Sequence, residues 1–124
     1  MPPPQWGDYS EKPFTCEVVV ADEKAWLRPA GELDLASVPV LDGHLERLAS
    51  RGQREITVDL SDLTFIDSSG LHLLLKWSKR ATEAAIEFSL ITGRPAVQRV
   101  FALAGVEQLL PFARPDLGAH DAGF

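Results

Sequence analysis

The stretch that decides the fold covers residues 59–70 and reads Asp59-Leu60-Ser61-Asp62-Leu63-Thr64-Phe65-Ile66-Asp67-Ser68-Ser69-Gly70. It follows a segment, residues 55–60, in which apolar side chains take every second position, the pattern of a strand with one buried face. A helical pattern of apolar residues follows it, over about residues 69–83. The stretch is therefore predicted to be a loop that leads from a buried strand into a helix.

The segments before this stretch predict a hairpin and a helix. Residues 14–21 are β-branched and apolar, and residues 25–29 are expected to pair with them as a second strand that ends at Pro29. Residues 31–34 (Gly-Glu-Leu-Asp) are predicted to be a connecting loop. A helix is expected from an N-cap at Ser37 to a glycine C-cap near Gly52, because Pro39 falls in its first turn and leucines recur at helical spacing.

The segments after it predict one more strand and one more helix. Residues 86–91 are predicted to form a strand, and a helix is expected to start at Pro95 and stop at Gly105. Residues 108–110 are assigned to a short final strand. Strands that alternate with helices favour an α/β fold, here with a mixed sheet of four to five strands and three or more helices. We expect one domain over residues 14–110, a flexible arm over 1–13 and a flexible tail over 111–124.

Composition excludes several classes of function. The 124 residues carry a net charge of −6, which argues against binding nucleic acid or an anionic membrane. No apolar run approaches the ~18 residues of a membrane span, and residues 1–6 lack a signal-peptide pattern, so a cytoplasmic location is expected. The single cysteine, Cys16, permits no intrachain disulfide or cysteine zinc site, and we expect it to be a small buried apolar residue.

Ser68 and Ser69 lie at the start of a helix, where free backbone N–H groups and the helix dipole stabilise an anion. One interpretation is that a serine or Asp67 simply caps the helix. The other is that a serine hydroxyl is a nucleophile or accepts phosphate. A nucleophilic serine needs a base, yet the chain has no Gly-x-Ser-x-Gly elbow and no Gly-rich nucleotide loop. We therefore expect neither an enzyme nor a cofactor or metal site.

Two apolar residues of the predicted helix over 69–83 lie between its apolar and its polar face, so that two interpretations are open for them. Its core face is formed by Leu71, Leu74, Leu75, Ser78 and Ala81, while His72 and the basic residues face water. Leu73 and Trp77 lie four residues apart, between the two faces. They are either the edge of the core or anchors for a partner, since tryptophan is enriched at binding hot spots.

Residues 58–71 as a whole resemble the signature of STAS domains, and the likeness is to the anti-sigma factor antagonists among them. The run Pro29-Ala30-Gly31-Glu32-Leu33-Asp34 resembles a second conserved patch of that family, and the likeness extends over about residues 14–110. The resemblance implies that Ser68 is phosphorylated by an anti-sigma factor that is also a serine kinase. The unphosphorylated form then binds that kinase and frees a sigma factor, and a phosphatase restores it.

The resemblance also implies where the partner binds. We expect contacts at Gly31, Glu32, Asp34, Asp67, Ser69, Gly70, Leu71, His72, Leu73 and Trp77. His72 stands where the family usually has glycine, so it selects a partner, slows phosphorylation or has no role. Two other functions stay open: a STAS subunit of a lipid-transport or stress-signalling assembly, and a sensor domain for a small molecule or nucleotide.

Overall fold

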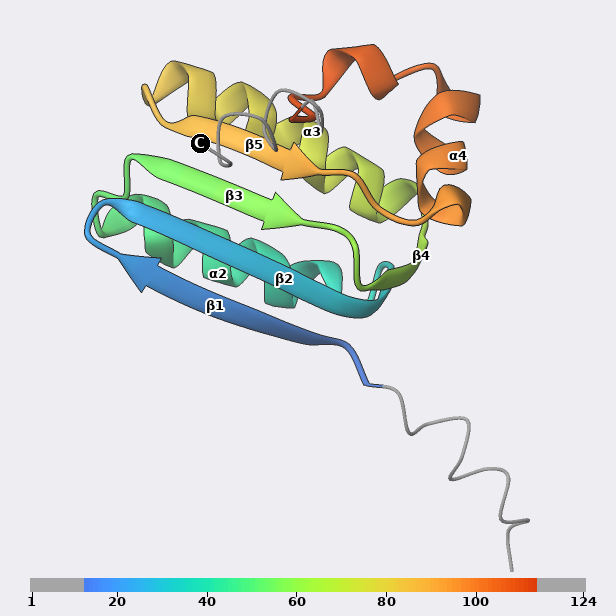
Figure 1. The fold of residues 1–124 in the computed structure, drawn as a ribbon, viewed down its shortest axis with the longest axis horizontal. Coiled ribbons are helices and arrows are strands. Elements are labelled where there is room, and N and C mark those ends of the chain that lie inside the picture. Colours follow the sequence, from blue (N-terminus) through green and yellow to red (C-terminus); the bar gives the residue numbers. More distant parts are fainter. Residues whose placement is uncertain (1–12, 114–124) are drawn as a thin grey trace, which may run out of the picture.

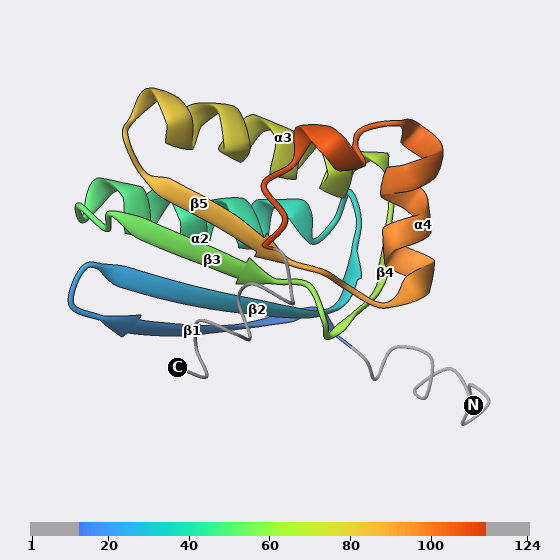
Figure 2. The same cartoon turned by 45° about the horizontal axis from the view of Figure 1, so that its top comes forward.

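The computed structural model describes residues 13–113, which fold into a mixed sheet with helices against it (Figures 1 and 2). The elements, in chain order, are β1 (Thr15–Ala21), β2 (Lys24–Leu33), α2 (Val38–Ser50), β3 (Glu55–Asp59), β4 (Leu63–Ile66), α3 (Ser68–Glu83), β5 (Glu87–Ile91), α4 (Pro95–Ala104) and the short 3₁₀ helix η1 (Glu107–Leu109). Three α-helices and five strands among the described residues confirm the predicted fold class. The predicted arm and tail lie outside the described residues, except for residues 13 and 111–113.

Strand β2 is the centre of the sheet because it pairs with three other strands. It runs antiparallel to β1, as the predicted hairpin requires, and parallel to both β3 and β4. Its first half pairs with β3, ending at Leu27 opposite Val58, and its last residues pair with β4, starting at Gly31 opposite Leu63. Strand β5 extends the sheet on the far side of β3, also in parallel.

Two expectations about β2 are wrong. The strand does not end at Pro29, and residues 31–33 are not a loop, because β2 continues to Leu33. Proline normally breaks a sheet because it has no N–H for the ladder. Pro29 lies between the part of β2 that pairs with β3 and the part that pairs with β4, where that side of the strand has no ladder partner.

Two shorter segments also differ from the prediction. Residues 63–66, which were expected to be part of a loop, form strand β4. This strand pairs with the last residues of β2. Residues 108–110 do not form a strand; the 3₁₀ helix η1 occupies that place. Phe112 instead forms a single parallel bridge to Leu90 on the outer edge of β5, where the Ala113 N–H donates to the Leu90 carbonyl.

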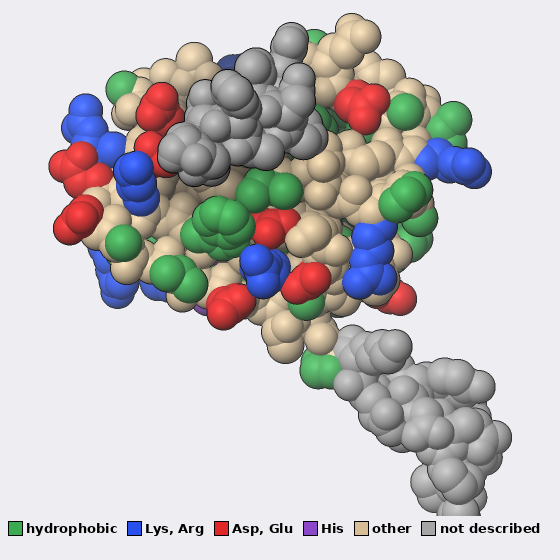
Figure 3. All heavy atoms as spheres, in the orientation of Figure 1, with side chains coloured by type: hydrophobic (Ala, Val, Ile, Leu, Met, Phe, Trp, Pro, Cys, Tyr) green, Lys and Arg blue, Asp and Glu red, His purple; other side chains and the backbone are tan. Residues whose placement is uncertain are grey.

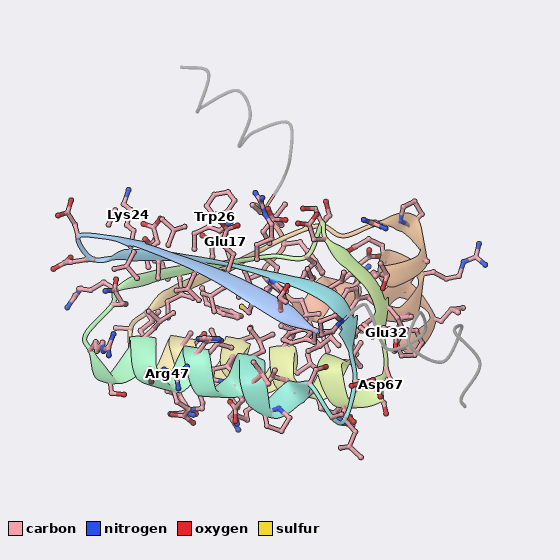
Figure 4. The ribbon with its side chains drawn as sticks, turned by 90° about the horizontal axis from the view of Figure 1, so that it is seen from below. Glu17, Lys24, Trp26, Glu32, Arg47 and Asp67 are labelled. Carbon is pink, nitrogen blue, oxygen red and sulfur yellow. The ribbon has the colours of Figure 1, made fainter. Side chains whose placement is uncertain are left out.

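Helices α2 and α3 cover one face of the sheet, and α4 lies at the end where β4 is found (Figures 1 and 4). Alternate residues of β2 and β3, such as Leu27, Ile56 and Val58, are fully buried against the helices. The opposite face of the sheet carries Glu17, Lys24 and Trp26 (Figure 4). On that face acidic, basic and apolar side chains are interspersed (Figure 3). The core therefore lies between the sheet and the helices, and the ends of β2 and β4 lie at the edge of this core.

Candidate functional site

The parallel pairing of β2 with β4 brings the two sequence patches together. Both strands end at the same edge, at Leu33 and Ile66, which are paired with each other. The Asp67 N–H donates to the Leu33 carbonyl over 3.1 Å, which fixes the start of α3 beside the end of β2. Glu32 and Asp67 consequently lie at the same end of the sheet (Figure 4). Segments about thirty residues apart in the sequence thus form one surface.

Asp67 is the N-cap of α3. Its backbone is extended, and its Oδ1 accepts a hydrogen bond from the Gly70 N–H at 3.1 Å. This bond satisfies one of the free donors of the first turn. The cap therefore accounts for Asp67 and leaves Ser68 at the first helical position. Ser68 is exposed, and its hydroxyl makes no hydrogen bond to another residue between 13 and 113.

Gly70 has a packing role that only glycine can fill. A β-carbon at this position would lie 2.7 Å from Ile66 Cγ1 and 2.9 Å from Leu33 Cγ. Both distances are shorter than any ordinary carbon–carbon contact. The glycine therefore lets the first turn of α3 lie directly on the ends of β2 and β4, and it holds Ser68 close to that edge.

The turn that follows β2 is held by its own side chains. Asp34 Oδ1 accepts hydrogen bonds from the N–H groups of Ala36 and Ser37, each at 3.1 Å. The Ser37 hydroxyl is buried; it donates to the Glu32 carbonyl at 2.7 Å and accepts from the Asp34 N–H at 2.9 Å. Residues 34–37 are thus a fixed part of the site, and Ser37 begins α2 as predicted, although its side chain bonds backward and does not cap the helix.

The predicted partner-binding residues fall into two groups by exposure. Glu32 and His72 are exposed, as Ser68 is, and Gly31, Asp34, Asp67 and Ser69 are half-buried around them. Gly70 and Leu71 are buried, since the first turn of α3 packs on the sheet. The structure therefore brings the two patches together and leaves mainly their polar members at the surface.

Leu73 and Trp77 are not exposed, and the expectation that they anchor a partner is wrong for this structure. Leu73 is 4% exposed and Trp77 is 1% exposed. The Trp77 indole N–H donates to Asp42 Oδ1 of α2 at 2.7 Å, and the Arg80 guanidinium lies 4.2 Å from the centre of its ring. Helix α2 packs against this rim of α3, which helical periodicity alone did not reveal. Both residues belong to the core.

Apolar side chains at the site were missed by the sequence analysis. Leu35 is 76% exposed in the turn after β2, and Val40 and Phe65 are each 46% exposed in α2 and β4. The signal that could have found Phe65 depends on recognising β4 as a strand: Phe65 is adjacent to Ile66, and neighbouring residues of a strand point to opposite faces. Either Phe65 or Ile66 must therefore face away from the core.

The chemistry available at this edge is that of an acidic surface that carries the exposed hydroxyl of Ser68. Glu32, Asp34 and Asp67 form no ion pair within residues 13–113. No group of three metal-ligating side chains occurs in the described part of the chain. Cys16 lies on β1, where burial raises its pKa to about 11 despite a backbone hydrogen bond at Arg28 that lowers it, so its thiol is protonated at neutral pH. None of the described helices is long and apolar enough to cross a membrane.

Comparison with known families identifies the class of protein that this fold and edge represent. The model of the family described as "Mlab, STAS domain" matches residues 16–111, which is most of the chain. The chain therefore belongs to the STAS domain family. This confirms the family predicted from the patches at residues 29–34 and 58–71.

Individual relatives are anti-sigma factor antagonists. The chain is 28% identical over 94 residues to the anti-sigma-B factor antagonist of Staphylococcus aureus, covering 76% of this chain and 87% of that protein. It is 29% identical over 83 residues to the putative anti-sigma factor antagonist BtrV of Bordetella bronchiseptica, covering 67% and 72%. The unphosphorylated form of the anti-sigma factor antagonist SpoIIAA superposes with a TM-score of 0.68 at 25% identity, covering 90% of this chain and 98% of that one.

Proposed function

We propose that this protein is an anti-sigma factor antagonist that binds an anti-sigma factor with serine kinase activity and thereby releases a sigma factor. It acts by binding, not as an enzyme. The observation that carries the proposal is the exposed Ser68 hydroxyl at the first position of α3, next to a helix cap that Asp67 already provides. The similarity to relatives named as anti-sigma factor antagonists extends over 76% and 67% of the chain, which supports this assignment.

Phosphorylation of Ser68 is the proposed switch. Phosphate adds about −1.5 to −2 charge at neutral pH. The N–H groups of the first turn of α3 stabilise an anion there, so the domain stays folded after modification. In the complex, however, Ser68 faces the kinase's bound nucleotide, because the acceptor hydroxyl must approach the phosphate that is transferred. A phosphate already on Ser68 would meet that anionic group and would also lose its hydration, so binding weakens. A phosphatase then restores the binding form.

The experiment that tests this proposal maps the modified residue. The full chain is incubated with ATP and a candidate serine kinase of the histidine-kinase-like ATPase class, and the products are analysed by mass spectrometry. We expect one phosphate on Ser68, none on Ser68→Ala, and an unchanged yield on Ser69→Ala. Phosphate on Ser69 alone, or on neither serine, would refute the assignment of the switch.

A second function is favoured by one specific observation: the matching family is described by the name Mlab, not as an anti-sigma factor antagonist. In this alternative the chain is a STAS subunit of another assembly, such as a lipid-transport complex, and its partner binds permanently. The same surface would be used, but no kinase would modify Ser68. A partner whose affinity is the same for wild type and for Ser68→Asp would favour this alternative.

A further inference from the structure

Exposed apolar side chains gather around the end of β2. Of the large apolar residues that the described chain leaves exposed, Leu35, Val40 and Phe65 lie here. Leu35 is in the turn after β2, Val40 is in the first turn of α2, and Phe65 pairs with Glu32 from the neighbouring strand β4. Exposed apolar residues that cluster, unlike ones scattered singly, mark a surface that contacts something else.

A hollow of about 270 Å³ opens beside this cluster, on the side of β2 away from Ser68. Its apolar wall is formed by Phe14, Ala36 and Val40, and its acidic rim by Glu32 and Asp34. Ser37 also lines it, but the hydroxyl of Ser37 is already bonded within the turn. The hollow thus combines an apolar wall with two carboxylates.

The two carboxylates of this hollow pair with no cation among residues 13–113, unlike several carboxylates elsewhere on the surface. Asp42 pairs with Lys76, Glu46 with Arg80, and Asp59 with Arg28. Glu32 and Asp34, in contrast, have no lysine or arginine within 4.0 Å among residues 13–113, and no basic residue lines the hollow. The hollow therefore offers negative charge that no residue between 13 and 113 neutralises, and it complements a cation.

We propose that the hollow receives a lysine or arginine side chain of the protein partner. Such side chains pack their aliphatic stems on apolar surface while the charged head reaches polar groups at the edge. Phe14 and Val40 would contact the stem, and Glu32 and Asp34 would accept hydrogen bonds from the head, which are strong when both groups are charged. This inference rests on the proposed function, because it describes how the partner that reaches Ser68 is also held on the other side of β2.

The first test uses the full chain and a small probe, so that it does not depend on the partner. N-acetyl-arginine amide is titrated into ¹⁵N-labelled protein, with the neutral N-acetyl-glutamine amide as the matched probe. We expect saturable shifts of the amide signals around Glu32, Asp34 and Val40 with the arginine probe only. These shifts should be absent in Val40→Lys, which places a positive charge in the hollow. Shifts spread over the whole surface, or unchanged in Val40→Lys, would overturn the proposal.

The second test uses the kinase from the phosphorylation experiment and measures its affinity by calorimetry. Val40→Lys should bind at least about tenfold more weakly, because a like charge is placed opposite the partner's cation. Leu103→Lys is the matched control, since Leu103 is 81% exposed on α4, away from the hollow, and its affinity should stay within about twofold of wild type. Each substitution is also checked for its effect on stability.

The outcomes separate this inference from the proposed function. If phosphorylation of Ser68 weakens binding but Val40→Lys binds like wild type, the hollow does not take a partner side chain and the switch still stands. If the kinase binds neither form of the protein, the proposed function is wrong, and the titration with N-acetyl-arginine amide then decides about the hollow by itself.

Discussion

The first turn of α3 and the middle of the same helix differ in how their side chains are exposed and bonded. Ser68 is exposed, and its hydroxyl has no partner among residues 13–113. Nine residues further on, Trp77 is buried, hydrogen-bonded to Asp42 of α2 and covered by the Arg80 guanidinium. The start of the helix thus carries an exposed side chain at Ser68 that is unbonded within the described part of the chain, whereas the part that meets α2 carries a buried and bonded one at Trp77.

This difference predicts that substitutions along α3 have separable effects. Changes in the middle of the helix should lower the free energy of unfolding, since they remove packing between α2, α3 and the sheet. Changes of exposed groups in the first turn should alter partner binding with little effect on stability. The packing residues of the first turn, Asp67 and Gly70, are expected to lie between these limits.

The largest expected effect is on stability at Trp77. Trp77→Ala removes a buried ring and leaves a cavity, so the free energy of unfolding should fall by about 3–5 kcal/mol. Trp26, which is 40% exposed on the open face of the sheet, is the matched control, and Trp26→Ala should cost only about 1 kcal/mol. Denaturant unfolding measures both. A large loss of partner affinity by a Trp77→Ala protein that is fully folded would instead make Trp77 a binding anchor.

A smaller loss is expected when Gly70 gains a side chain. Gly70→Ala brings a methyl group against Ile66 and Leu33, and overpacking of this kind costs about 1–3 kcal/mol. Gly43→Ala in α2 is the control, because its β-carbon would meet only the end of Arg47 at 3.6 Å. That change should stabilise the protein by up to about 1 kcal/mol, as alanine favours a helix more than glycine. Equal effects at both positions would mean that α3 does not pack closely on the strand ends.

Asp67 and Ser68 differ in their contribution to the helix cap. Asp67→Ala removes the acceptor for the Gly70 N–H and should cost about 0.5–2 kcal/mol. Ser68→Ala should change stability by no more than about 0.5 kcal/mol, because Ser68 is exposed and does not cap. Thermal unfolding at one pH compares the two. A larger loss for Ser68→Ala than for Asp67→Ala would show that the serine carries the cap.

The smallest effect is an acid dependence of the contact between α2 and α3. Burial raises the pKa of Asp42, but hydrogen bonds from Trp77 and Lys76, together with the charges of Lys76 and Arg80, outweigh it and hold the pKa below its usual value. A carboxyl whose pKa is lower in the folded state adds stability above its unfolded pKa, and this stability is lost as the pH falls through the folded pKa.

The contribution of Asp42 should therefore be complete near neutral pH and be lost as the pH falls from about 4, the usual pKa of aspartate, through the lower pKa of the folded state. Unfolding of wild type and of Asp42→Asn is compared from pH 7 to pH 2. The difference in stability between them should shrink toward acid pH. A difference that stays constant over this range would show that the charge of Asp42 does not stabilise the folded state.

The sequence was sufficient to predict the three α-helices and four of the five strands of the described residues, and the position of Ser68 at a helix start, because these depend on local patterns. Alternation marks β3, and leucine spacing with Pro39 marks α2. Strand β4 was missed because four residues are too few to show a period, although its pairing with β2 is what joins the two halves of the site.

The wrong predictions at Pro29 and Trp77 have a common cause. The environment of each residue is set by another element that packs or pairs beside its own. Proline is accepted inside β2 because two different strands share that side of it, with a gap between them. Trp77 is buried because Asp42 and its helix lie against it. The sequence of one segment does not show which element packs against it. Helical periodicity therefore placed Trp77 at the edge of the core face of α3, and in the structure α2 covers that edge.

The central claim is that phosphate on Ser68 switches partner binding without unfolding the domain. The most direct measurement is the affinity of the kinase for the unphosphorylated chain and for the chain phosphorylated on Ser68, by calorimetry at one ionic strength, with thermal unfolding of both forms. We predict that the phosphorylated form stays folded and binds at least about tenfold more weakly, a difference of about 1.4 kcal/mol. Equal affinities of the two folded forms would contradict the account.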